Sequence, residues 1–154
     1  MILTWDQYFM GIAHLSRLRS KDPSTQVGAC IVNPNKRIVG IGYNGLPKGC
    51  EDDFFPWERE GEFLDTKYPY VVHAELNAIL NSTVKLEGCS IYVSLFPCNE
   101  CAKAIIQSGI SEVVYEDDKY ACTDNVKASK KMLLAAGVQL RQLEQKINIE
   151  VTIG

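Results

Sequence analysis

Hydrophobic and polar residues follow two different periods along this chain. Near the N-terminus, apolar side chains recur every three or four residues behind Thr4, a residue suited to cap a helix, so the spacing predicts a helix over about 4–20. Helical spacing returns later, and it predicts helices over 73–80, 98–108 and 125–136.

Short apolar runs predict the strands. Runs over 27–32 and 37–43 flank the turn residues between them, which predicts an antiparallel hairpin. Three further strands are predicted over 90–95, 113–115 and 138–140. The tail over 147–153 alternates like an edge strand, which could either pair or fray.

The order of these elements predicts the fold class. After the hairpin, helices and strands alternate, which indicates an α/β fold, a three-layer α-β-α sandwich with a mixed five-stranded sheet. With 154 residues and 46% hydrophobic content, the chain suits a single domain over 1–154, with the tail 143–154 at its periphery.

Two segments follow neither period. The segment 44–50 contains two glycines and a proline, so its backbone could approach a ligand closely, although a plain surface loop has the same composition. The segment 51–70 is acidic and then aromatic. Loops of this length are usually functional or disordered, and the aromatic residues favour order.

Candidate chemistry lies at two predicted helix starts. His73 and Glu75 begin one helix, and Cys98 and Cys101 follow Pro97 at the start of another. One histidine and two cysteines form an admissible ligand set for catalytic zinc, and the order H-x-E then P-C-x-x-C is the signature of zinc deaminases. A reduced cysteine pair beside a capping histidine is the alternative, but it does not explain why all three ligands lie at helix starts.

The remaining cysteines and the other histidine suggest no second metal site. Cys30 and Cys89 lie in apolar strand contexts, where free cysteine behaves as a small hydrophobe. Cys50, Cys122 and His14 are likewise assigned no role.

The net charge and the lack of targeting segments limit the kinds of partner that we expect for this chain. A net charge of -3 argues against a protein that grips many nucleic-acid phosphates, whereas a small ligand with one phosphate remains possible. No stretch approaches the length of a membrane span, and the N-terminus lacks a secretory signal, so no membrane partner, a cytoplasmic location and reduced thiols are expected.

Several blocks outside the zinc motif carry a family resemblance. The runs 22–29, 42–47, 65–70, 97–103 and 118–120 together resemble the deoxycytidylate deaminases of the cytidine deaminase superfamily, and the resemblance covers nearly all of 1–142. Other branches of the superfamily differ. Free-nucleoside deaminases carry Cys where His73 stands, polynucleotide cytosine deaminases have a Trp-containing run where 94–96 stands, and tRNA adenosine deaminases usually lack the 65–70 block.

The resemblance implies zinc-dependent hydrolysis of dCMP to dUMP, a product that supplies thymidylate synthesis. One Zn²⁺ on His73, Cys98 and Cys101 would activate water, and Glu75 would carry protons. Asn44 is expected to bond the 3′-hydroxyl and the Ala74 amide to contact the base. The candidates for the 5′-phosphate are Ser24, Asn81, Lys119 and Tyr120.

The resemblance also implies regulation and assembly. Enzymes of this type are typically hexamers, activated by dCTP with Mg²⁺ and inhibited by dTTP, and the effector site is expected among Gly42, Tyr43, Gly45, Pro47, Lys48, Asp52 and Asp53. Two other hypotheses remain. A tRNA or other nucleic-acid deaminase is opposed by the acidic charge balance, and a catalytically inactive zinc-stabilised binding protein is opposed by the retention of Glu75.

Overall fold

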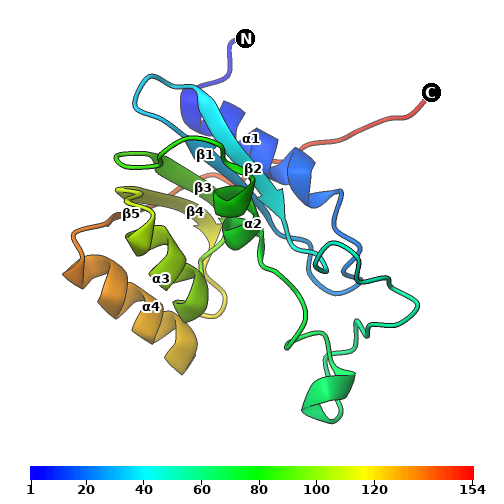
Figure 1. Ribbon diagram of the computed structural model, residues 1–154. Helices are drawn as coiled ribbons and strands as arrows, with labels where there is room; N and C mark the ends of the chain where they lie inside the picture. The colour runs from blue at the N-terminus through cyan, green and yellow to red at the C-terminus, as the bar shows by residue number, and fades with distance from the viewer.

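A computed structural model describes residues 1–154, and its centre is a five-stranded mixed sheet (Figure 1). The strands lie in the order β2-β1-β3-β4-β5. β1 pairs antiparallel with both β2 and β3, whereas β3, β4 and β5 run parallel. Their bounds are β1 Gly28–Val32, β2 Ile38–Tyr43, β3 Ser90–Leu95, β4 Glu112–Asp117 and β5 Gln139–Gln142.

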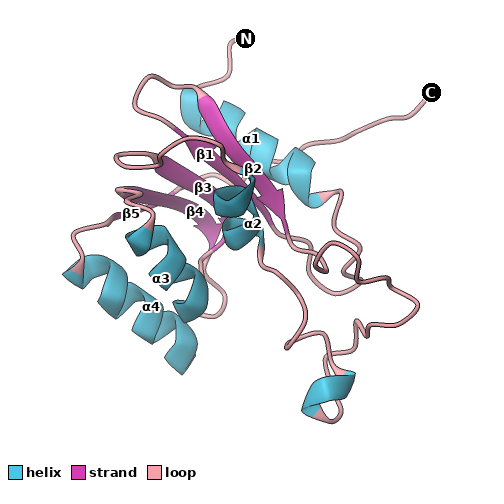
Figure 2. Ribbon diagram, in the orientation of Figure 1, coloured by secondary structure: helices cyan, strands magenta, loops and turns pink.

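Helices cover both faces of the sheet (Figure 2). α1 packs on one face, and α2, α3 and α4 pack on the other, which makes three layers. The helices are α1 Trp5–Arg17, α2 Ala74–Asn81, α3 Asn99–Gln107 and α4 Asp124–Ala135, with a short 3-10 helix η1 over Phe63–Asp65. No helix combines the length and apolar character needed to cross a membrane.

Local chemistry explains where the first helix begins. The Gln7 amide donates to the Thr4 hydroxyl at 3.1 Å, and the Thr4 amide donates to the Gln7 side chain at 2.9 Å. This reciprocal capping box satisfies two of the amide groups that a helix start leaves unpaired. Thr4 is therefore the N-cap of α1, as its position in the sequence predicts.

The two faces of the sheet have separate apolar cores. In β1, Ala29 and Ile31 join the larger core beneath α2, α3 and α4, whereas Cys30 and Val32 join the smaller core beneath α1. Successive side chains of a strand point to opposite faces, so a strand covered on both sides needs an unbroken apolar run. All five residues of β1 are accordingly buried.

The C-terminal tail forms no strand, although its alternating sequence resembles an edge strand. Leu143 and Ile147 instead pack against the core beneath α1. The Ile147 amide donates to the Glu116 carboxylate at 2.6 Å, and the other oxygen of that carboxylate lies 2.5 Å from His14 Nε2. A buried side-chain carboxylate thus holds the tail, and β5 remains the edge of the sheet.

The long segment between β2 and α2 extends away from the sheet (Figure 2). An isolated antiparallel bridge joins Gly45 to Val72 at its two ends. Within it, the Lys67 amide donates to the Glu58 carbonyl at 2.9 Å. This closed loop brings residues that are distant in sequence to the N-terminal end of α2.

Candidate active site

Three potential metal ligands meet where the first turns of α2 and α3 face each other. His73 is the N-cap of α2 and Cys98 the N-cap of α3, and neither side chain makes a capping hydrogen bond. The Cys98 and Cys101 sulfurs each lie 3.4 Å from His73 Nδ1, and all three ligand atoms lie within 4.8 Å of one another. Tetrahedral zinc with bonds of about 2.3 Å to sulfur and about 2.0 Å to nitrogen needs a sulfur-to-nitrogen separation of about 3.6 Å, so this ligand set fits zinc.

The ligand cluster is also electrostatically suited to a cation. A hydrogen bond donated by the Cys101 thiol lowers the Cys98 pKa to about 4, with a further contribution from His73. The hydrogen bond to Cys98 raises the His73 pKa to about 9, and the pKa of Cys101 is raised because this thiol donates to Cys98. These contacts favour the thiolate form of Cys98, which is the form of cysteine that binds metals.

Glu75 lies beside the cluster but is not one of the three candidate ligands. It is only 4% exposed, and burial raises its pKa to about 7. Residues two apart on a helix do not face the same way, so His73 can point to the metal while Glu75 faces the cavity. A carboxyl group with a pKa near neutrality can both accept and donate a proton.

A cavity of about 340 Å³ opens in front of these groups, with His73, Glu75 and Cys98 in its wall. Half of its 18 lining residues are hydrophobic. The other walls come from the segment before β1, from Asn44, from the loop 59–71, from the end of β3 and from the segment that leads into α4. Its volume and mixed lining suit a small, partly polar ligand.

Comparisons with known proteins agree with this geometry. A family model described as the cytidine and deoxycytidylate deaminase zinc-binding region matches residues 3–117. Deoxycytidylate deaminases of Mus musculus and Homo sapiens are each 58% identical over 146 residues, which is 94% of this chain and 82% of each relative. The chain belongs to the cytidine and deoxycytidylate deaminase family.

A solved structure extends the likeness to three dimensions. The crystal structure of dCMP deaminase from the cyanophage S-TIM5 in complex with dCMP and dUMP matches with a TM-score of 0.72 at 28% identity. The match covers 93% of this chain and 99% of that one. The predicted three-layer fold and the prediction that the chain is an enzyme of this deaminase family are confirmed.

Of the residues predicted to bind substrate in this deaminase, only some line the cavity. Asn44, Ala74 and Tyr120 lie in its wall, whereas Ser24 lies in an adjoining hollow. Asn81, near the other end of α2, donates to the Ile41 carbonyl at 3.1 Å. The Lys119 ammonium lies 5.3 Å from the Tyr120 ring centroid, and this residue lines a different hollow on the α1 side.

Asn44 has a structural role in the wall of the cavity. Its side-chain amide donates to the Thr25 carbonyl at 2.9 Å and to Asp22 Oδ2 at 3.3 Å, and its oxygen accepts from the Val27 amide at 2.8 Å. Both donor hydrogens are thus engaged within the protein. An amide oxygen has two lone pairs, so Asn44 can still accept one hydrogen bond from a ligand hydroxyl.

The seven residues predicted for an effector site of this deaminase do not line the cavity. Gly42 packs against the backbone of α2, where a Cβ atom would lie 2.4 Å from the Ala74 oxygen. Asp52 pairs with Lys21 at 3.0 Å and accepts a bond from the Trp57 indole at 3.3 Å. The others are Tyr43, Gly45, Pro47, Lys48 and Asp53.

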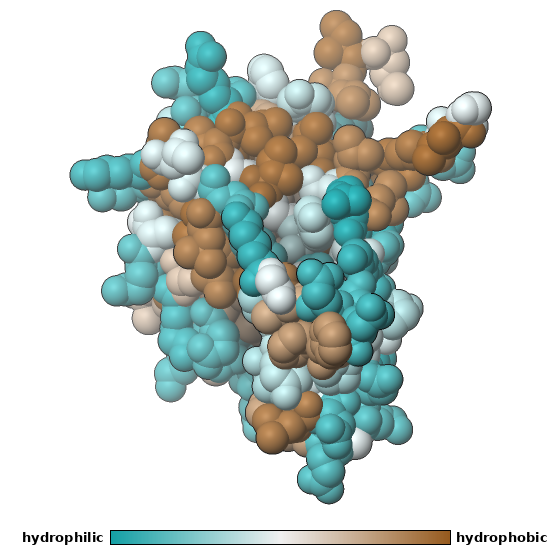
Figure 3. Space-filling view, turned by 45° about the vertical axis from the view of Figure 1, so that its right-hand side comes forward, coloured by the Kyte–Doolittle hydropathy of each residue, from teal (hydrophilic) through white to brown (hydrophobic).

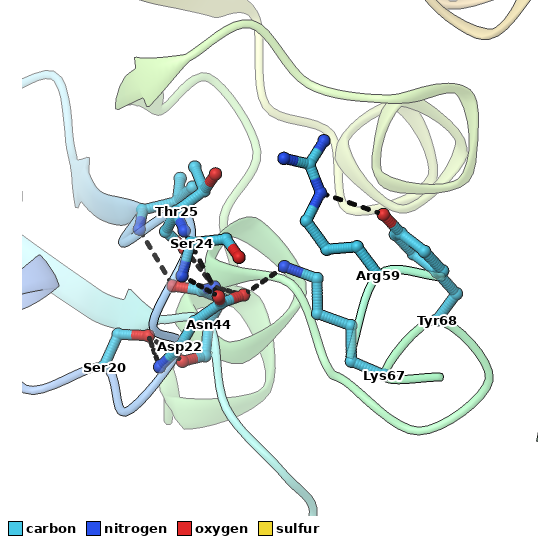
Figure 4. Close-up of polar contacts among 9 residues, drawn as sticks. Ser20, Asp22, Ser24, Thr25, Asn44, Arg59, Lys67 and Tyr68 are labelled. Atoms are coloured by element: carbon cyan, nitrogen blue, oxygen red, sulfur yellow. Dashed lines mark hydrogen bonds and ion pairs between the residues drawn. The ribbon is translucent and has the colours of Figure 1, made fainter. Parts of the chain in front are cut away.

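Asp22, Lys67 and Arg59 are charged residues of the cavity wall that were not singled out in the sequence (Figure 4). Asp22 accepts from the amides of Ser24 and Thr25 at 2.8 and 3.2 Å, and its other oxygen lies 2.6 Å from the Lys67 ammonium. The third residue, Arg59, comes from the loop before α2. Asp22 and Lys67 each lie in a block that carries the family resemblance, but nothing in the local sequence around Arg59 indicates a site.

Proposed function

We propose that this chain catalyses the hydrolytic, zinc-dependent deamination of dCMP to dUMP and ammonia. The observation that carries the proposal is the cluster of His73, Cys98 and Cys101 with a separate buried carboxylate, Glu75, in one small cavity. The names of the mouse and human relatives, and the dCMP and dUMP bound to the cyanophage enzyme, support the choice of substrate.

The metal ligands and Glu75 have different roles in this proposal. When bound by His73, Cys98 and Cys101, zinc supplies Lewis-acid activation of water at neutral pH. Glu75 takes a proton from the attacking water and delivers it to N3 of the cytosine ring as C4 is attacked. It then carries a proton to the amino group, which leaves as ammonia.

The residues of the cavity wall other than the metal ligands and Glu75 orient the substrate. The Asn44 oxygen has one free lone pair, with which it accepts a hydrogen bond from the 3′-hydroxyl, since its donors are held by Asp22 and Thr25. The backbone of Ala74, between His73 and Glu75, contacts the base. Phe96 and Val126 supply apolar surface on the side of α3 and α4.

Regulation by dCTP with Mg²⁺ and by dTTP is part of the same proposal. The segment from Gly42 to Lys48 supports it, because Asn44 in this segment lines the cavity and Gly45 pairs with Val72, one residue before His73. An effector bound on the outer side of this segment would shift both Asn44 in the cavity wall and the bridge between Gly45 and Val72. Sigmoidal dCMP kinetics that become less sigmoidal with dCTP are expected; hyperbolic kinetics unchanged by either nucleotide would contradict this part.

A homo-oligomer, expected to be a hexamer, completes the proposal. Large apolar side chains are exposed on α1, on β2 and after α2, among them Trp5, Leu15, Ile41 and Val84. Figure 3 shows apolar residues gathered over the upper part of one face. Extended apolar patches of this kind are typical of protein interfaces. Sedimentation equilibrium measures the assembly directly.

One assay separates this function from its alternatives. Absorbance loss is followed on dCMP, CMP, deoxycytidine, dCTP and a tRNA anticodon stem, beside a Glu75→Ala variant. Turnover of dCMP is expected, and it should fall by at least about 100-fold in the variant while the zinc content stays the same. Deamination of the RNA, or of deoxycytidine but not dCMP, would overturn the choice of substrate. Activity that survives in the variant would overturn the role of Glu75.

A further inference from the structure

Two asparagine side chains of α2 donate hydrogen bonds to the backbone of β2. Asn77 Nδ2 lies 2.8 Å from the Tyr43 carbonyl oxygen, and Asn81 Nδ2 lies 3.1 Å from the Ile41 carbonyl oxygen. Residues four apart on a helix share a face, and carbonyls two apart on a strand point to the same side. The two side chains therefore make the same kind of bond between this helix and this strand, one turn apart.

α2 lies close enough to β2 for these bonds because two residues of the strand are glycines (Figure 1). A Cβ atom on Gly40 would lie 2.7 Å from the Ala78 oxygen, as one on Gly42 would crowd the first turn of α2. The asparagine amides then reach past the glycines to the strand backbone. The position of α2 on the sheet is thus set by close packing and by two polar contacts.

Asn77 makes one side-chain contact that Asn81 lacks. Its Nδ2 also lies 3.5 Å from the Val72 carbonyl oxygen, and a primary amide has two hydrogens, one for each carbonyl. The backbone amide of Asn77 donates to the His73 carbonyl at 3.0 Å, a bond that any residue here could make. Asn77 therefore contacts both peptide groups that flank the His73 Cα atom, and its side chain supplies the contact on the Val72 side.

Val72 is held from its other side by Gly45. The Val72 amide donates to the Gly45 carbonyl at 2.8 Å, and the Val72 carbonyl accepts from the Gly45 amide at 3.0 Å. The Asn77 side chain thus lies where the chain leaves β2, at Tyr43, and where it returns to α2, at Val72. Loss of this side chain would release the peptide before His73 from the helix that follows it.

The His73 imidazole has few other contacts that could orient it. It makes no capping hydrogen bond, and its Nδ1 faces the sulfurs of Cys98 and Cys101. Its Nε2 has no hydrogen-bond partner in the protein, although the second nitrogen of a metal-bound histidine is usually held by such a partner. The orientation of this ligand therefore depends on the backbone on either side of it.

We propose that Asn77 is a positioning residue for the metal site, because its side chain ties the peptide before His73 to the end of β2 and so fixes the direction of the imidazole. The inference rests on the proposed function, since it takes zinc as the ion held by the cluster. Its test needs no turnover.

Zinc affinity, measured by competition with a chromophoric chelator, tests the role of Asn77. Asn77→Ala should weaken zinc binding by about 10-fold, the lower end of the range for outer-shell partners of metal ligands. The matched control is Asn81→Ala, which removes the same kind of bond to β2 and should bind zinc as tightly as the wild type. Asn77→Gln keeps an amide donor one methylene further out and should bind zinc more tightly than Asn77→Ala.

The visible absorption of the cobalt-substituted proteins reports the geometry of the metal ligands. The spectrum should change in Asn77→Ala and not in Asn81→Ala, while circular dichroism shows both zinc-loaded variants folded. A wild-type zinc affinity and cobalt spectrum in Asn77→Ala, or equal losses of zinc affinity in the two alanine variants, would overturn the inference. If Asn77→Ala does not fold, Asn77→Gln compared with Asn81→Gln decides the question by the same two measurements.

These measurements are made without substrate, so they separate this inference from the proposed reaction. A wild type that binds zinc through a site sensitive to Asn77 but does not deaminate dCMP would overturn only the reaction. A wild type that deaminates dCMP while Asn77→Ala keeps the wild-type zinc affinity and cobalt spectrum would overturn only the role of Asn77.

Discussion

The Asp22 carboxylate and the Lys67 ammonium lie 2.6 Å apart in the wall of the cavity, although 45 residues separate them in the sequence. Their side chains are only 2% and 10% exposed. The pair joins the segment before β1 to the loop before α2, and Asp22 also orients Asn44 through a 3.3 Å hydrogen bond. A single ion pair therefore holds together two of the loops that form the wall of the cavity.

Replacing Lys67 with Met should destabilise the protein strongly. The substitution leaves a buried carboxylate without its cation, an effect of about 3–5 kcal/mol in other proteins. Urea unfolding followed by circular dichroism measures the change. Lys21→Met is the matched control, because its 3.0 Å pair with Asp52 is exposed and should contribute little. Equal losses in the two variants would contradict the structural role of the buried pair.

Gly42→Ala should separate α2 from β2. A Cβ atom at this position would lie 2.4 Å from both the Ala74 oxygen and the Ala78 nitrogen. These are backbone atoms, which cannot rotate away as the end of a flexible side chain could. Overpacking of this kind typically costs about 1–3 kcal/mol, and the shift of α2 would also move His73 and lower the zinc content. Thermal unfolding and metal analysis measure both effects.

Gly45→Ala provides the control for this substitution. Its added Cβ atom would meet only the Tyr43 ring at 3.9 Å, an ordinary contact distance. Its melting temperature and zinc content should match those of the wild type. If Gly42→Ala behaved the same way, close packing would not explain the glycine in β2.

Zinc content should depend on the cysteines of the cluster and not on the others. Cys101→Ser removes one of three ligands, so bound zinc should fall from one per chain to near zero and dCMP turnover with it. Cys122→Ser, which alters an exposed cysteine, should leave both unchanged. Chelation of the wild type should abolish turnover, and added zinc should restore it; turnover that persists in metal-free protein would exclude zinc from the reaction.

Arg141 should make stability depend on pH in the acid range. A hydrogen bond from Arg141 lowers the pKa of Asp6 below its ordinary value of 3.8, and a second bond comes from Tyr92. The folded-state pKa lies below the unfolded one, so the stabilisation is present above about pH 3.8 and is lost as the pH falls through the folded-state pKa.

In Arg141→Gln, stability should therefore fall less steeply below pH 5 than in the wild type. Unfolding free energies from urea titrations at pH 7, 5, 4 and 3 measure the difference. Both proteins keep His73, Cys98 and Cys101, so any loss of a bound metal at low pH affects both of them equally. Parallel pH profiles would show that the Asp6–Arg141 contact adds nothing to stability.

The sequence by itself determined most of the helices and strands and the cluster of candidate metal ligands. Thr4 and its capping partner Gln7 are three residues apart, and the candidate metal ligands Cys98 and Cys101 have the same spacing, so near neighbours in the chain specify both features. The unbroken apolar run of β1 indicates that this strand is buried on both faces of the sheet. Even here the helix starts differ by one residue from the prediction, because His73 and Cys98 are N-caps and the helices begin at Ala74 and Asn99.

Only the tertiary structure decided which polar groups meet at the cavity. Arg59 has no periodicity or motif around it, yet the chain path brings it into the cavity wall with Thr25 and into the adjoining hollow with Ser24. The structure of the C-terminal tail could not be predicted from its local pattern either. Its sequence alternates like a strand, but the Glu116 carboxylate holds it as a packed segment that does not pair with the sheet. Local patterns report the preferences of neighbouring residues, whereas pairing between distant polar groups depends on the chain path that brings them together and on the burial that makes an unpaired group costly.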